Sequence, residues 1–218
     1  MQDPIAVPTL PEQPDAALAG RVDAVLDGYV GSSIVGAVVH VVRDGELVCR
    51  RAAGHADRES GRAMTADTPF RLASVTKPYV TVAALALVDR GILELDAPIT
   101  RWLPEFRPRF DGAEAVITLR HLLTHTSGLA YGFAQGPDGP YPSAGISDGI
   151  DRPGFDLAEN LRRLAVAPLT FAPGSAWLYS LATDVLGAVL QAATGRPLAE
   201  VVRDQVTGPL GLGHTMFV

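Results

Sequence analysis

The sequence predicts an α/β part followed by a mostly helical region, and three patterns carry this prediction. A Val-rich run at 35–42 and a second run at 46–53 are separated by Asp44-Gly45, which is a strong hairpin signal. Residues 15–29 before the hairpin repeat apolar side chains at helical spacing. Apolar helical patterns dominate the rest of the chain. We expect three parts: the first section of an α/β domain at 1–64, a helical domain at 65–200, and the start of a return to the α/β domain at 201–218.

Periodicity and terminal residues predict the elements in chain order. The run at 35–42 does not alternate, so we expect both faces of its strand to be covered, as in a sheet flanked by helices. Residues 54–69 are polar and rich in turn formers, and residues 128–154 form a long loop rich in Gly and Pro. Loops of that length are usually functional or disordered. Helices are predicted at 15–29, 74–90, 119–124, 157–165, 183–193 and 197–205.

Composition excludes several classes of function. With 218 residues, of which 47% are hydrophobic, the chain can build a packed core. A net charge of −6 argues against nucleic acid or an anionic membrane as partner. The single cysteine, Cys49, allows no intrachain disulfide and fits a buried strand position. The first residues do not have the pattern of a secretory signal, and the apolar stretch 79–88 is too short to cross a bilayer. We therefore expect a cytoplasmic protein, or a periplasmic or secreted one if a signal peptide was removed.

Lysine usage points to one position. The chain has 18 Lys and Arg residues, and Lys77 is the single lysine among them. Arginine cannot be deprotonated in a protein, whereas burial can neutralise a lysine amine. A solitary lysine therefore suggests a position where arginine chemistry fails. The alternative is chance survival in an Arg-rich sequence.

The segment Ser74-Val75-Thr76-Lys77 is the main catalytic signal. Residues three apart share a helix face, so Lys77 can reach the Ser74 hydroxyl. The positive end of the helix is expected to lower the pKa of Lys77, and its free N–H groups can face a developing oxyanion. A neutral lysine beside a serine makes an activated nucleophile. Ser-x-x-Lys alone is a weak motif, but here it uses the only lysine and opens an apolar helix.

A second signal lies at 173–180, where a Pro-Gly turn leads into Trp177, Leu178 and Tyr179. A phenol near an ammonium is more acidic than usual and can shuttle a proton. Tyr179 is therefore a candidate for the site. Its alternative is an ordinary core tyrosine.

Four stretches together resemble the serine β-lactamase and penicillin-binding family and, within it, the bacterial family VIII carboxylesterases. They are Phe70-Arg71-Leu72-Ala73-Ser74-Val75-Thr76-Lys77, His121-Leu122-Leu123-Thr124-His125-Thr126-Ser127-Gly128-Leu129, residues 173–180, and Pro209-Leu210-Gly211-Leu212. The resemblance implies a β-lactamase/transpeptidase-like fold and no cofactor. It implies Ser74 as the acylated nucleophile, Lys77 as its base or proton relay, and Tyr179 as the base partner that protonates the leaving group.

One departure from the family pattern bears on the substrate. The family's Tyr-x-Asn motif has Leu181 in place of Asn, which weakens recognition of an amide and favours an ester. We expect substrate contacts from Leu181, Tyr131 and Trp177. The first alternative is a class C-type β-lactamase or D-Ala-D-Ala peptidase. The second is an inactive fragment or binding module that needs a second polypeptide.

Two further patterns are interpreted as decoys. His121 and His125 have the spacing of zinc ligands, but the Glu of the zinc-protease pattern and a third ligand are missing, so no metal is expected. Residues 145–149 match Gly-x-Ser-x-Gly, but Ser147 lies in a Gly- and Pro-rich loop instead of a strand-to-helix elbow.

The chain is expected to need further strands. It contains one confident strand pair, and a flanked sheet needs more. The family's third motif, of the Lys-Thr-Gly or His/Trp-Gly-Gly kind, does not occur in the sequence. We therefore expect the C-terminal strands to come from a second polypeptide segment, with a small-molecule ester as substrate.

Overall fold

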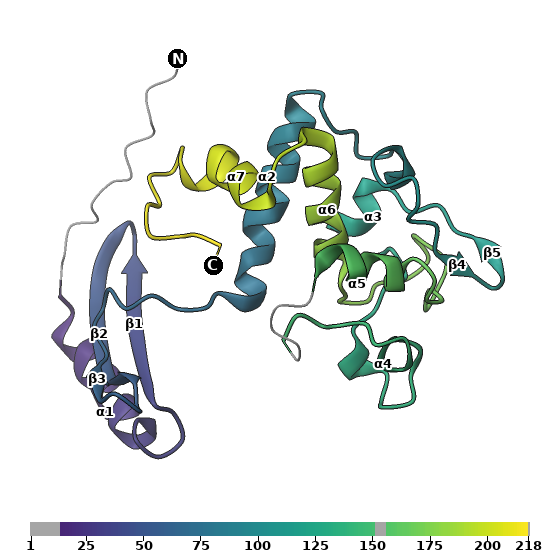
Figure 1. Cartoon of the computed structure of the whole chain (residues 1–218). Helices are drawn as coiled ribbons and strands as arrows, with labels where there is room; N and C mark the ends of the chain where they lie inside the picture. The colour runs from purple at the N-terminus through teal and green to yellow at the C-terminus, as the bar shows by residue number, and fades with distance from the viewer. Residues whose placement is uncertain (1–13, 151–155, 218) are drawn as a thin grey trace. The chain divides into compact units, whose positions relative to one another are not determined.

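The computed structural model describes residues 14–150 and 156–217, which form two compact units (Figure 1). The first unit ends at Leu72 and the second begins at Ala73, later than the boundary expected after residue 64. Residues 201–217 stay with the second unit instead of returning to the first. The end of the predicted 128–154 loop lies outside the described residues, as do the first residues of the predicted 1–64 part.

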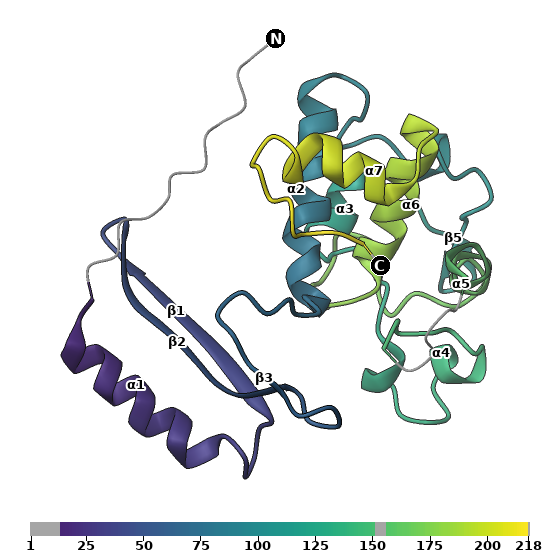
Figure 2. The ribbon, with the colours of Figure 1, turned by 60° about the vertical axis from the view of Figure 1, so that its left-hand side comes forward.

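The first unit is a helix and a twisted hairpin. Its elements are α1 (Ala16–Tyr29), β1 (Gly36–Arg43), β2 (Glu46–Asp57) and β3 (Arg62–Ala63), with antiparallel strands in the order β1-β2-β3. Asp15 caps α1 by accepting from Leu18 N at 2.9 Å, at the start of the helix predicted over 15–29. Asp44 and Gly45 both take positive φ at the hairpin turn, which confirms the predicted strand pair. Figure 2 shows α1 lying along β2.

The expected burial of both faces of β1 is wrong for the described part of this unit. None of the β1 residues is buried, and Val42 is 50% exposed. The buried strand residues are Val48 and Cys49 of β2, which confirms the position expected for the cysteine. The reason is that α1 packs against β2, so one helix cannot cover both strands on both faces.

The second unit is helical, with a small two-stranded ribbon. Its helices are α2 (Thr76–Asp89), α3 (Leu119–Leu123), α4 (Pro140–Ser143), α5 (Leu157–Leu164), α6 (Ala182–Thr194) and α7 (Leu198–Val202). Single turns are η1 (Ala73–Val75), η2 (Ile99–Arg101), η3 (Gly132–Ala134) and η4 (Arg203–Thr207), and the ribbon is β4 (Arg109–Phe110) with β5 (Ala113–Glu114).

Helix α6 forms the centre of this unit. It contacts α2, α3, α5 and α7 (Figure 1), and its side chains are buried almost all round. Gly187 permits the close approach of α7, because a Cβ at that position would lie 2.9 Å from Leu198 Cδ2. Gly195, at φ 67, ends the helix in the left-handed conformation. The core therefore fixes α6 as a rigid support for its neighbours.

Helix α2 carries one apolar stripe. Val80, Ala83, Ala84 and Leu87 are buried at helical spacing and face α6 and α7. The helix starts at Thr76 and not at Ser74 as predicted, because Ser74 lies in the 3₁₀ turn η1. The stripe anchors the helix whose first turn presents Lys77.

Candidate active site

Two segments far apart in the sequence are joined by backbone hydrogen bonds. Residues 125–130 accept from residues 170–181 at four points: Thr170 N to Gly128 O at 2.8 Å, Gly174 N to Thr126 O at 2.8 Å, Leu178 N to His125 O at 3.0 Å, and Leu181 N to Ala130 O at 3.2 Å. Tyr131 directly follows the first segment, and Tyr179 lies in the second. The pairing therefore brings these two rings to a centroid separation of 5.5 Å.

Gly128 makes this pairing possible. It has φ +83, and a Cβ there would lie only 2.3 Å from the carbonyl oxygen of Phe171. Only glycine combines that conformation with such a close approach. The site therefore depends on a glycine in the resembling stretch at 121–129.

Ser74 and Lys77 meet as the spacing predicts. Lys77 Nζ donates to Ser74 Oγ at 3.3 Å, from the first turn of α2 to the preceding 3₁₀ turn. Ala73, immediately before the serine, has φ 46, which is a strained conformation for an alanine. Strained backbone is often held at active sites because it orients a reacting group. Ser74 itself is exposed, so its hydroxyl is accessible to a substrate.

Lys77 extends between the two tyrosines. Its Nζ lies 5.0 Å from the ring centre of Tyr179 and 5.7 Å from that of Tyr131. The structure thus brings together Ser74, Lys77 and Tyr179, the three residues predicted as catalytic, with Tyr131 beside them.

The direction predicted for the pKa of Lys77 is wrong. Burial by itself lowers this pKa, but hydrogen bonds to Tyr131 and Tyr179 and their charge raise it above the ordinary value. The interactions that raise the pKa come from two phenols outside the helix, whereas the prediction considered the helix terminus. The raised pKa favours the ammonium form of Lys77 over the neutral amine on which the sequence argument relied.

The environments of the two tyrosines push their pKa values apart. Burial raises the pKa of Tyr179, but hydrogen bonds to Ser74 and Lys77 and the ammonium charge outweigh burial and leave it below its ordinary value. Burial dominates at Tyr131 and raises its pKa despite the hydrogen bond to Lys77. Such divergence assigns acid and base roles. The lowered pKa makes Tyr179 the better candidate base of the two phenols.

Two neighbours of this cluster were not predicted as site residues. His125 has φ 55, packs its ring 4.9 Å from that of Tyr179, and has Nδ1 3.4 Å from Ser180 Oγ. Burial, and then the charge of Lys77, lower its pKa. Burial raises the pKa of Asp184, in the first turn of α6, and the charge of Lys77 opposes that rise. Asp184 is the one charged residue of the segment 182–194, and this was the signal that could have identified it.

The predicted substrate contacts have different placements. Leu181 is 1% exposed and belongs to the core, so its side chain is not available to a substrate in this structure. Its position at the start of α6, where its N–H donates to Ala130, accounts for this burial. Trp177 is 64% exposed with its ring edge-on to His125, and Tyr131 is buried beside Lys77.

The two decoy patterns have structural roles. His121 Nδ1 accepts from Thr118 N at 3.2 Å in the capping box of α3, while His125 packs on Tyr179. No group of three or more His, Cys, Asp and Glu side chains able to hold a metal occurs within 14–150 and 156–217. Ser147 is 2% exposed and is preceded by the short helix α4 instead of a strand, so the described loop is not a nucleophile elbow.

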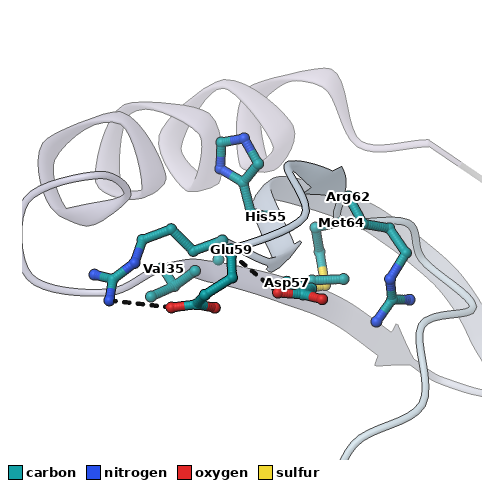
Figure 3. A pocket seen from close by; sticks show the side chains of 9 residues that line it. Val35, His55, Asp57, Glu59, Arg62 and Met64 are labelled. Carbon is teal, nitrogen blue, oxygen red and sulfur yellow. Dashed lines mark hydrogen bonds and ion pairs between the residues drawn. The ribbon is translucent and has the colours of Figure 1, made fainter.

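A separate hollow of about 510 Å³ lies in the first unit (Figure 3). Its lining contains no serine, cysteine or lysine. The carboxylate of Asp57 accepts from Ser60 Oγ at 2.8 Å and from Glu59 N at 3.1 Å, and Arg58 pairs with Glu59. These local contacts stabilise the turn before β3, and we assign the hollow no catalytic role.

The sequence pattern of the family described as Beta-lactamase matches residues 22–218. The chain belongs to the beta-lactamase family. Esterase EstB of Burkholderia gladioli is 61% identical over 205 residues, which cover 93% of this chain and 52% of that protein. The chain thus spans about half the length of this curated relative. No described helix is long and apolar enough to cross a membrane.

Solved structures of the family share the fold. EstCE1, described as a hydrolase with promiscuous acyltransferase activity, superposes with a TM-score of 0.84 at 45% identity, covering 90% of this chain and 52% of that one. The D-amino acid amidase of Ochrobactrum anthropi SV3, complexed with L-phenylalanine amide, superposes with a TM-score of 0.69 at 27% identity, covering 90% of this chain and 52% of that one. These matches establish the β-lactamase/transpeptidase-like fold expected from the sequence.

Proposed function

We propose that this chain carries the catalytic residues of a serine hydrolase that cleaves carboxylic esters through an acyl-enzyme on Ser74. The observation that carries the proposal is the accessible Ser74 hydroxyl hydrogen-bonded to Lys77, beside a phenol whose pKa is lowered. The 61% identity to a protein named as an esterase supports the same reaction.

The proposed reaction uses Tyr179 as the general base. Tyr179, as phenolate, takes the Ser74 proton while Oγ attacks the ester carbonyl carbon. The resulting tetrahedral intermediate expels the alcohol, to which Tyr179 returns the proton, and the acyl group remains on Ser74. Tyr179 then takes a proton from water, which attacks the acyl carbonyl carbon. As the C–Oγ bond breaks and the acid leaves, Tyr179 returns that proton to Ser74 Oγ and becomes a phenolate again. Lys77 stabilises the phenolate as an ammonium in both steps.

Esters are favoured over amides because the position of the family's asparagine holds a buried leucine. Leu181 offers no side-chain hydrogen bond, and a neutral hydrogen bond contributes about 0.5–1.5 kcal/mol. The likeness to a D-amino acid amidase favours amide hydrolysis as the second candidate. Among the predicted contacts, Trp177 and Tyr131 remain proposed substrate neighbours.

We further propose that activity requires a segment equivalent to the remainder of the relatives. In the described part of the first unit, β1 lies at the edge of a three-stranded sheet and pairs with β2 alone. An edge strand presents a row of unpaired N–H and C=O groups, which is a template for another strand. A strand from that segment would pair with β1. The segment would also supply an oxyanion donor, and loss of one such donor typically costs ~10²–10³-fold in rate.

A comparison of two proteins tests both proposals. One is the 218-residue chain alone, and the other is the chain joined to the part of Esterase EstB outside the match. We expect short-chain p-nitrophenyl esters to be hydrolysed by the joined protein at least about 100-fold faster than by the chain alone. We also expect its kcat/KM for these esters to exceed that for a chromogenic cephalosporin and for D-phenylalanine amide. Equal rates in the two proteins would contradict the need for a further segment, and preference for either amide would reverse the substrate ranking.

A further inference from the structure

The Gly145–Gly149 segment that matches Gly-x-Ser-x-Gly makes an unusual set of contacts for a surface loop. Asn160 of α5 holds it from one side: Ser147 N donates to Asn160 Oδ1 at 2.9 Å, and Asn160 Nδ2 donates to Ser147 O at 2.9 Å. Arg163 of the same helix donates to the carbonyl of Gly145 at 2.6 Å. Ile146 is buried in the core. The segment is therefore fixed to α5 and to the core.

Asp148 extends from this fixed segment to the residues after Tyr131. Its Oδ1 accepts from Gly132 N at 2.7 Å, and its Oδ2 accepts from Phe133 N at 3.0 Å. One carboxylate thus binds two successive N–H groups at the start of η3, for which Tyr131 is the capping residue. A carboxylate held by two such donors makes short, strong hydrogen bonds.

Gly132 lies close to the carboxylate of Asp148. A Cβ on Gly132 would lie 3.2 Å from Asp148 Oδ2, so an alanine would need the carboxylate or the turn to shift by a few tenths of an ångström. The phenol of Tyr131 faces Lys77, and its ring stacks on Phe133 at a centroid distance of 4.9 Å. The position of both aromatic rings is consequently set by the turn that Asp148 holds.

We propose that Asp148 is a positioning residue that fixes Tyr131 against Lys77. The proposal rests on the proposed function insofar as Tyr131 and Lys77 serve ester hydrolysis. Asp148 does not contact the reacting atoms and acts through the backbone of Gly132 and Phe133. The Gly-x-Ser-x-Gly segment thereby contributes its aspartate to catalysis and not its serine.

The kinetic test uses Asp148→Asn in the protein joined to the EstB segment. The amide keeps the shape but can accept only one of the two hydrogen bonds, so we expect kcat to fall by about 10-fold while KM changes by less than about 2-fold. Asp138→Asn is the matched control, because Asp138 is an exposed carboxylate in the same loop. Gly132→Ala is an independent disturbance of the same contact and should lower kcat similarly.

A double mutant separates positioning from general destabilisation. If Asp148 acts through Tyr131, Asp148→Asn should not lower kcat further when Tyr131 is already phenylalanine, because the two residues are coupled. If the decreases in kcat from Asp148→Asn and Tyr131→Phe multiplied in full in the double mutant, the proposal would be overturned. So would a kcat for Asp148→Asn equal to that of the wild type.

A spectroscopic measurement tests the contact even if the wild type hydrolyses no ester. In the ¹⁵N-labelled 218-residue chain, Asp148→Asn should shift the amide resonances of Gly132 and Phe133 and accelerate their hydrogen exchange, while Asp138→Asn should not. Unchanged Gly132 and Phe133 amides would overturn the proposal. Shifted amides together with an inactive joined protein of wild-type sequence would overturn the proposed function instead and leave the structural role of Asp148 supported.

Discussion

Replacing Lys77 by methionine removes the ammonium beside Tyr179 and should move the pH dependence of ester hydrolysis. The base works as phenolate, so the rate rises with pH and levels off above the pKa of Tyr179. Lys77 helps to lower that pKa. Without the ammonium the pKa rises, so the plateau of the variant lies at higher pH than that of the wild type. The ratio of wild-type to variant rates therefore decreases as pH increases.

The magnitude follows from the geometry. Two unit charges separated by the 5.0 Å between Lys77 Nζ and the Tyr179 ring centre interact by about 0.8 kcal/mol at the dielectric constant of water and about 3 kcal/mol at an effective constant of 20. The site is partly exposed, so the interaction lies between these values. Below the plateau, kcat/KM of Lys77→Met should be lower by about 4- to 300-fold.

The assay is hydrolysis of a short-chain p-nitrophenyl ester by the joined protein from neutral to moderately alkaline pH. Lys77→Arg is the control, because it keeps a cation. Its rate should level off at the same pH as that of the wild type, but at a lower value because the hydrogen bond to Ser74 is lost. Burial raises the pKa of Tyr141 to about 12, so that phenol does not titrate in this range. If the rates of Lys77→Met and of the wild type levelled off at the same pH, the electrostatic role of Lys77 would be refuted. Equal losses in Lys77→Met and Lys77→Arg at every pH would instead favour Lys77 as a base.

Three further predictions concern single residues. Ser147→Ala should retain ester hydrolysis in the joined protein while Ser74→Ala falls to background, because Ser147 is 2% exposed; loss of activity in the Ser147 variant with an unchanged fold would contradict this. Tyr141→Phe should lower the free energy of unfolding, measured in urea, by about 1–3 kcal/mol, because the hydroxyl accepts from the buried N–H of Ala130 at 3.1 Å. An unchanged midpoint of urea unfolding would show that this N–H finds another partner. Gly128→Ala should lower that free energy by at least about 2 kcal/mol, because φ is +83 and the new methyl would lie 2.3 Å from a carbonyl oxygen; a wild-type thermal transition would exclude this strain.

The elements that the sequence predicted well are those specified by local residues. The helices predicted at 15–29 and 183–193 are α1 and α6, and Asp44-Gly45 forms the predicted hairpin turn. The Ser74–Lys77 contact is local for the same reason, since three residues separate the partners.

The parts that the sequence could not predict depend on distant contacts. Tyr131 meets Tyr179 because residues 125–130 pair with residues 170–181, and no periodicity announces that pairing. The pKa of Lys77 was predicted in the wrong direction because only the local helix terminus was considered, whereas both phenols come from elsewhere in the chain. The same limit applies to Leu181, whose burial follows from its place at the start of the central helix.

The central claim, that Ser74 is the acylated nucleophile, is tested most directly by locating a covalent label. The joined protein is treated with a fluorophosphonate, digested, and analysed by tandem mass spectrometry. The proposed mechanism predicts one adduct, on Ser74, that is absent from Ser74→Ala and slower to form in Lys77→Met. An adduct on Ser147 or on another residue, or equal labelling of Ser74→Ala, would contradict it.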